Sequence, residues 1–72
     1  MRNYNIDGII EELTIKPTNK QAQTCLILCQ WLSNCYQDIH LFRFDDQTGE
    51  VYILAGEEIE IIVLTNGIWE FL

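Results

Sequence analysis

The segment of residues 17–21, Pro-Thr-Asn-Lys-Gln, marks the start of a helix. The Thr18 hydroxyl can accept a hydrogen bond from the backbone N–H of Gln21, and the Gln21 side chain can accept one from the backbone N–H of Thr18. This reciprocal pair is a capping box. Such a cap contributes on the order of 1 kcal/mol, and Pro17 discourages the helix from extending backward. The sequence therefore predicts a helix over about residues 19–36.

The apolar residues of this helix define two faces. At 100° per residue, one stripe collects Ala22, Cys25, Cys29, Leu32 and Tyr36, with Leu26 and Leu28 on its flanks. We expect this stripe to face the core. Ile27 and Trp31, four residues apart, fall on roughly the opposite side among polar residues. The folding of a monomer does not explain an exposed pair of this kind.

From residue 39 onward the apolar residues alternate, which is typical of strands. Turn-forming residues lie at 45–49 and 56–57, and Asn66-Gly67 is a strong hairpin signal because both residues tolerate the positive φ of a type I′ turn. We expect strands at about residues 39–45, 50–55, 58–65 and 68–72. Sequential hairpins favour a four-stranded antiparallel meander in the order 1-2-3-4. The predicted fold class is α+β, with the helix on one face of the sheet.

The turns also predict which strand residues share a face. With a one-residue bulge at the Gly56 turn, the face toward the helix collects Phe42, Phe44, Val51, Ile53, Ile59, Ile61 and Val63. A two-residue turn at Asn66-Gly67 pairs Leu64 with Trp69 and Ile62 with Phe71. These four side chains then form an apolar patch on the opposite face, which needs a cover.

Seventy-two residues allow a single domain with a modest core. Within it, residues 1–16 are expected to be an N-terminal covering segment and residues 17–72 the helix and meander. Residues 6–15 place Ile6, Ile9, Ile10 and Leu13 at helical spacing, but Gly8 and the β-branched residues suit a short strand nearly as well. This segment or a second subunit is the candidate cover for the sheet patch.

The chain carries eleven acidic residues against four basic ones, a net charge of −7. Nucleic-acid binding requires clustered Lys and Arg, and attraction to an anionic membrane is disfavoured for the same reason. We expect neither partner, whereas a basic protein partner remains open. No apolar run approaches the roughly 20 residues of a membrane-spanning helix, and the first residues lack the apolar core of a signal peptide. A cytoplasmic location is expected.

Three cysteines, Cys25, Cys29 and Cys35, lie in the predicted helix. Their odd number makes a poor disulfide framework, so reduced thiols are expected. Cys25 and Cys29 are one helical turn apart, but His40 is the only further soft ligand, and a closed zinc site takes four. No nucleophile motif surrounds these thiols. We predict no metal, no cofactor and no catalytic residue.

Two apolar features are left over, Ile27 with Trp31 on the helix and Ile62, Leu64, Trp69 and Phe71 on the sheet. Aromatic anchors among polar groups are typical of interface cores. The leading hypothesis is a small acidic non-enzymatic protein-interaction module, either a homodimer or the partner of another protein. One alternative is a metal- or thiol-based regulatory site on Cys25, Cys29 and His40. Another is an acidic nucleic-acid mimic or antitoxin-like partner.

Several segments are similar to a family of very short cyanobacterial proteins of unknown function. They are PTN at 17–19, CQWLSN at 29–34, DIHLFRFD at 38–45, YILAG at 52–56 and NGIWEFL at 66–72. The likeness covers the predicted helix and sheet. It implies a cyanobacterial origin and a small intracellular domain, and it supplies no activity, cofactor or binding residue.

Overall fold

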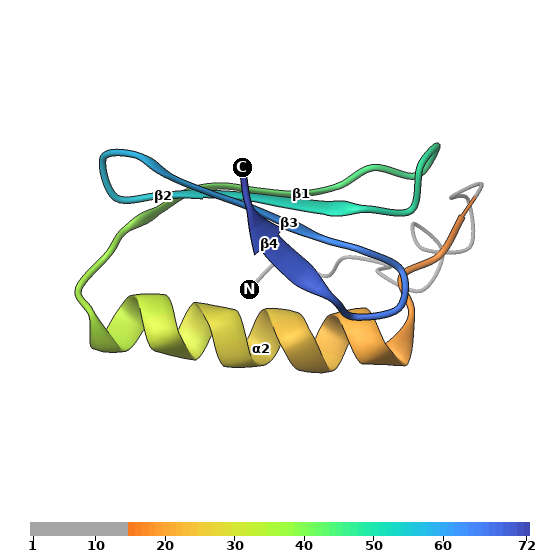
Figure 1. Cartoon of the computed structure of the whole chain (residues 1–72), viewed down its shortest axis with the longest axis horizontal. Coiled ribbons are helices and arrows are strands. Elements are labelled where there is room, and N and C mark those ends of the chain that lie inside the picture. The colour runs from red at the N-terminus through yellow and green to blue at the C-terminus, as the bar shows by residue number, and fades with distance from the viewer. Residues whose placement is uncertain (1–14) are drawn as a thin grey trace, which may run out of the picture.

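The computed structural model describes residues 15–72, which form one helix packed on one face of a four-stranded sheet (Figure 1). The elements are α2 (Asn19–Asn34), β1 (Ile39–Phe44), β2 (Val51–Ala55), β3 (Ile59–Val63) and β4 (Trp69–Phe71). All neighbouring strands are antiparallel, in the order β1-β2-β3-β4. The predicted α+β class and meander are confirmed. The helix or strand expected before residue 15 lies outside the described residues.

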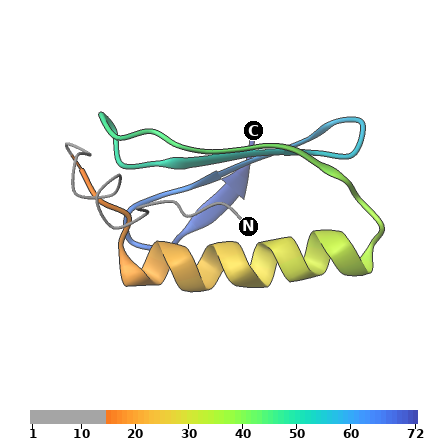
Figure 2. The same ribbon diagram turned by 180° about the vertical axis from the view of Figure 1, so that it is seen from behind.

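Thr18 caps α2 as predicted. Its backbone N–H donates to Gln21 Oε1 over 3.0 Å, and its Oγ1 accepts from the Gln21 N–H over 3.1 Å. Both halves of the capping box are therefore present, and the helix begins at Asn19. The Thr18 hydroxyl also donates to the carbonyl of Thr65 over 2.6 Å. The start of the helix is thus tied to the turn that follows β3, as Figure 2 shows from behind.

The helix ends earlier than predicted, because Tyr36 reverses the chain. The N–H of Gln37 donates to the Leu32 carbonyl over 2.9 Å, and the N–H of Tyr36 donates to the Ser33 carbonyl over 3.0 Å. These two bonds define a Schellman motif, whose central residue is left-handed and usually Gly. Tyr36 takes that conformation with a φ of 57°. The apolar stripe continues through Tyr36, so periodicity alone did not reveal the stop.

We expect replacement of Tyr36 by glycine to raise the free energy of unfolding by about 0.5–1 kcal/mol, because a left-handed backbone costs an L-residue roughly 1–2 kcal/mol and glycine almost nothing. The Tyr36 side chain is 93% exposed, so few contacts are lost. Chemical denaturation measures the gain. Tyr36→Ala is the control, since it removes the ring but keeps the Cβ; a gain as large with alanine would contradict the explanation.

The core lies between one face of α2 and the facing sides of β2 and β3. It consists of Cys25, Leu28, Leu32, Val51, Ile53, Ala55, Ile61 and Val63. On the helix, Gln21 is buried as well, so the buried face is turned from the predicted stripe toward Leu28. Ala22 and Tyr36, expected in the core, are exposed, and Cys29 is half-buried. The prediction counted Gln21 as a surface residue, but a polar side chain can be buried when it is hydrogen-bonded.

The pairing of β2 with β3 confirms the predicted inner face. Ile53 lies opposite Ile61, and Val51 lies opposite Val63. Residues 56–58 form the intervening turn, which is one residue longer than a two-residue hairpin turn. The extra residue places the inner-face residues of β2 opposite those of β3, which is the effect that the prediction assigned to a bulge at Gly56. The irregularity in the sheet lies instead in β1, between Ile39 and Leu41.

The pairing of β3 with β4 differs from the prediction by one residue. Val63 lies opposite Trp69 and Ile61 opposite Phe71. The Leu64 N–H donates to the Ile68 carbonyl over 2.8 Å, which leaves residues 65–67 in the turn. A three-residue hairpin turn commonly ends in a left-handed Gly, and Gly67 has a φ of 85°. The predicted two-residue turn at Asn66-Gly67 is therefore wrong.

A shift of one residue moves every side chain of a strand to the other face. Trp69 and Phe71 accordingly lie on the face toward α2, with Ile61 and Val63. Ile62, paired with Glu70, is on the outer face. The patch predicted to combine Ile62 and Leu64 with the two aromatic residues is not one surface.

Candidate functional site

Three aromatic side chains meet where α2 faces the edge strand β4. The centroid of the Phe71 ring is 6.2 Å from that of Trp31, at an interplanar angle of 58°, and 5.1 Å from that of Trp69, at 88°. Both separations are in the range of favourable tilted and edge-to-face aromatic pairs. Figure 1 shows β4 inclined toward the helix, which brings the strand's inner face to the helix flank. We call Trp31, Trp69 and Phe71 the aromatic rim.

The aromatic rim is only partly buried. Trp31 is 41% exposed, Trp69 39% and Phe71 56%. Ile27, one helical turn before Trp31, is 66% exposed. Rings this large are ordinarily buried more fully, and a contiguous exposed apolar surface marks an interaction site more often than an isolated exposed residue does.

The aromatic rim joins features that the sequence placed on opposite sides of the molecule. Trp31 was expected on the back of the helix and Phe71 on the back of the sheet, yet their rings are in contact. Conversely, the structure separates Ile62 and Leu64 from the rim: both are half-buried, and Ile62 lies on the outer face of the sheet. Four of the six residues expected at an interface, Ile27, Trp31, Trp69 and Phe71, thus lie along one side of the helix–sheet layer.

One side-chain hydrogen bond and one close backbone approach fix the turn before β4 against the helix. The Thr24 hydroxyl donates to the Gly67 carbonyl over 2.7 Å, which anchors the turn before β4 to α2. A Cβ on Gly67 would lie 3.0 Å from the Cβ of Lys20 and 3.1 Å from its carbonyl oxygen. The turn therefore approaches the helix backbone closely, and only glycine leaves room for this approach.

The outer face of the sheet carries a mixed surface. The Tyr52 hydroxyl donates to Glu60 Oε1 over 2.6 Å, and this bond to a carboxylate raises the pKa of Tyr52. Arg43 lies opposite Tyr52 on β1, and Glu60 opposite Leu54 on β3. Among residues 15–72, no helix or strand lies over this face (Figure 2). Its charges alternate with half-buried apolar residues, as on a solvated sheet surface.

The three cysteines lie in different environments. Cys25 is buried in the core, Cys29 is half-buried and Cys35 is exposed. Burial raises the pKa of the Cys25 thiol, and the neighbouring Cys29 raises it further. Burial also raises the pKa of Cys29. A raised pKa keeps a thiol protonated near neutral pH, which makes it a weaker nucleophile and metal ligand.

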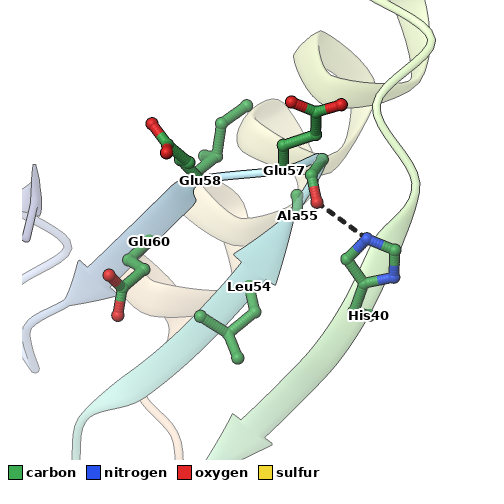
Figure 3. Close-up of a pocket in the computed structure, with 8 residues that line it drawn as sticks. His40, Leu54, Ala55, Glu57, Glu58 and Glu60 are labelled. Atoms are coloured by element: carbon green, nitrogen blue, oxygen red, sulfur yellow. Dashed lines mark hydrogen bonds between the residues drawn. The ribbon is translucent and has the colours of Figure 1, made fainter.

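His40 lies beside a separate depression of about 500 Å³. Its Nε2 donates to the Gly56 carbonyl over 2.8 Å. In Figure 3 the carboxylates of Glu57, Glu58 and Glu60 point in different directions, and none points toward the His40 ring. Within residues 15–72 there is no group of three or more His, Cys, Asp or Glu side chains placed to hold a metal ion.

The proposed grouping of Cys25, Cys29 and His40 is not brought together by the fold. Cys29 lines a groove with Tyr36 and Ile39, whereas His40 lines the depression beside Gly56. Cys29 and His40 therefore border different depressions of the surface, and Cys25 borders neither of them.

No helix of the described part of the chain is long and apolar enough to cross a membrane.

Comparison with known proteins gives one match. A family model described as a domain of unknown function (DUF6888) matches residues 16–70, which include α2, β1, β2, β3 and most of β4. No curated protein and no solved structure matches the chain significantly. The match identifies no activity and no site residue.

Proposed function

Because this chain belongs to the DUF6888 family, whose function is unknown, we propose a function from its own surface: it is a small acidic, non-enzymatic protein-interaction module that binds a protein partner through the aromatic rim. The observation that carries the proposal is the contact of Trp31, Trp69 and Phe71 on a part of the surface that is still 39–56% exposed. A few residues carry most of the binding energy of a protein interface, and Trp is enriched among them; Phe is enriched in interfaces as well.

The charge of the chain supports a protein partner over other classes. With a net charge of −7, attraction to phosphate groups is unfavourable, whereas a basic protein surface is attracted. The cytoplasmic location expected from the sequence, and the cyanobacterial origin implied by the family resemblance, are part of the same proposal. A regulatory site on Cys25, Cys29 and His40 has less support, because these side chains lie in separate environments.

Affinity capture from extract of the host, with the full chain as bait, tests this function. We expect Trp31→Ala and Trp69→Ala each to reduce the retained partner by at least tenfold, because truncating an interface aromatic anchor costs about 2 kcal/mol or more. Leu26→Ala is the matched control: Leu26 is an apolar residue of the same helix that is 71% exposed. Circular dichroism confirms that each variant folds.

Equal retention by the wild-type chain and both tryptophan variants would contradict the proposed function. Equal loss of the partner with Leu26→Ala would also contradict it, because the effect would then not be specific to the aromatic rim. The same samples, run in sedimentation velocity from micromolar to millimolar concentration, report self-association as a separate result.

A further inference from the structure

We propose that β4 and the aromatic rim bind an extended segment of the partner protein, which adds a fifth strand to the sheet with apolar side chains toward α2 and a basic side chain opposite Glu70. This inference rests on the proposed function and specifies the partner's chemistry. It depends on three observations: the open backbone edge of β4, the orientation of its side chains, and the charges beside it.

The backbone edge of β4 is open within residues 15–72, where β3 is the only strand that pairs with it. The Ile68 carbonyl accepts from the Leu64 N–H, and the Leu72 N–H donates to the Glu60 carbonyl. In an antiparallel pair, alternate residues point their N–H and C=O groups toward the partner strand. The N–H and C=O groups of Trp69 and Phe71 therefore point away from β3, where a fifth strand would bind them.

The side chains beside this edge separate into two kinds. Trp69 and Phe71 face α2, and Trp31 with Ile27 forms the exposed helix flank next to them. An added strand would place alternate side chains on this apolar surface and so extend the core by one strand. Glu70 lies on the other face and is exposed. The pattern that fits is apolar, basic, apolar across three successive partner residues.

Acidic side chains lie on the outer face of this edge but not on its helix side, so a basic residue of the partner is favoured on the outer face. Helix α2 contains no acidic residue, so the helix side of the site offers no counter-ion for a basic side chain. On the outer face, Glu60 and Glu70 are both exposed, on the adjacent strands β3 and β4. Opposite charges on directly facing residues stabilise strand pairing, and like charges oppose it.

A second copy of this chain fits the edge less well. In the two-fold antiparallel pairing that sets Trp69 opposite Phe71, the two Glu70 side chains face each other directly, and like charges at that position are destabilising. Each copy also carries a net charge of −7, so the two chains repel. A basic strand relieves both penalties.

The other edge strand, β1, is interrupted by the irregularity between Ile39 and Leu41 and carries Arg43, which disfavours a basic segment there.

Two blocked hexapeptides serve as probes, one of alternating lysine and valine and one of alternating glutamate and valine, titrated into the ¹⁵N-labelled full chain at low salt. We expect the lysine peptide to bind at least tenfold more tightly than the glutamate peptide. Bound peptide should slow hydrogen exchange of the Trp69 and Phe71 amides, because these N–H groups gain acceptors. The amides of β1 should keep their exchange rates.

Two charge-reversal variants separate a local contact from general attraction to an acidic protein. Glu70→Lys and Glu57→Lys change the net charge equally, but Glu57 lies in the turn between β2 and β3. We expect Glu70→Lys to weaken binding of the lysine peptide by roughly five- to tenfold, as reversal of a cross-strand pair implies, and Glu57→Lys by less than twofold. Both Phe71→Pro and Phe71→Ala remove the ring, but only Phe71→Pro also removes the outward N–H of residue 71. We therefore expect Phe71→Pro to bind the lysine peptide more weakly than Phe71→Ala does.

Three results would overturn the strand-addition proposal: absence of binding at millimolar peptide, binding without protection of the Trp69 and Phe71 amides, or equal effects of the two charge reversals. Concentration-dependent protection of the same amides without peptide would also overturn it, since a second copy would then occupy the edge. None of these results contradicts the proposed function, which the capture experiment with the tryptophan variants and the Leu26→Ala control tests separately.

Discussion

Replacement of Gln21 by leucine is expected to lower the free energy of unfolding by about 3 kcal/mol, although leucine is more hydrophobic and the position is 1% exposed. The loss combines the capping interaction, on the order of 1 kcal/mol, with the cost of leaving a buried carbonyl without its donor, about 1–3 kcal/mol. A small domain has only marginal stability to lose. Urea denaturation followed by circular dichroism measures the change.

The reason lies in three hydrogen bonds made by this one side chain. Gln21 Oε1 accepts from the Thr18 N–H over 3.0 Å. Its Nε2 donates to the Gly49 carbonyl over 2.5 Å and to the Val63 carbonyl over 3.3 Å. The amide thus joins the helix start, the β1–β2 turn and the end of β3. Leucine fills the space of the amide but satisfies none of these groups.

Glutamate at the same position separates hydrogen bonding from packing. Gln21→Glu keeps the acceptor for Thr18 but, when ionised, sets a carboxylate against the carbonyls of Gly49 and Val63. Burial raises the pKa of such a carboxyl. Since its folded pKa then exceeds its unfolded pKa, the variant should be least stable relative to wild type near neutral pH and recover as pH falls and the carboxyl becomes a donor. A loss below 1 kcal/mol for Gln21→Leu, or no such recovery, would contradict this role.

The elements predicted correctly are those whose determinants are local. The capping box needs only Thr18 and Gln21, three residues apart, and the hydrogen bonds are those expected from their chemistry. The turns and the strand order follow from turn-forming residues between alternating apolar runs. The burial of Gln21 was missed because its partners Gly49 and Val63 are 28 and 42 residues away in sequence. Local periodicity carries no information about such acceptors.

The candidate site was predicted only in part, because its geometry depends on one register. Asn66-Gly67 suits a two-residue turn with both residues left-handed, and it equally suits a three-residue turn that ends in a left-handed Gly67. Trp69 and Phe71 share a face in either case, but the two-residue turn places both on the outer face and the three-residue turn places both on the face toward α2. Packing against Trp31 and the bond from Thr24 to the turn favour the three-residue form. Both interactions join the helix to β4, and neither is visible within the hairpin sequence.

The helix flank was misjudged for a related reason. Trp31 was placed opposite the core, because the predicted stripe was centred on Cys25 and Cys29. With Gln21 and Leu28 buried, the helix is turned so that Trp31 borders the core and meets Phe71. Two errors, one in the helix and one in the hairpin, therefore hid a single surface. The residue types that mark it, exposed tryptophan and phenylalanine, were nonetheless evident from the sequence.

The second large effect is expected at Gly67, where alanine should lower the free energy of unfolding by about 2–3 kcal/mol. A left-handed φ costs an L-residue roughly 1–2 kcal/mol, and the added Cβ would lie 3.0 Å from the Lys20 Cβ and 3.2 Å from Thr24 Oγ1. The turn must then move away from α2, which strains the bond from Thr24 to the Gly67 carbonyl. Thermal and urea denaturation of Gly67→Ala measure the loss.

Asparagine at Gly67 distinguishes the two causes, because asparagine tolerates the left-handed region better than alanine but also carries a Cβ. If the close approach to the helix dominates, Gly67→Asn will be as unstable as Gly67→Ala; if backbone conformation dominates, it will recover most of the loss. A turn that the alanine Cβ displaces from α2 carries β4 with it and separates Phe71 from Trp31. We therefore expect Gly67→Ala to red-shift tryptophan fluorescence and to weaken partner capture, whereas unchanged fluorescence at full destabilisation would show that the aromatic rim does not depend on this anchor.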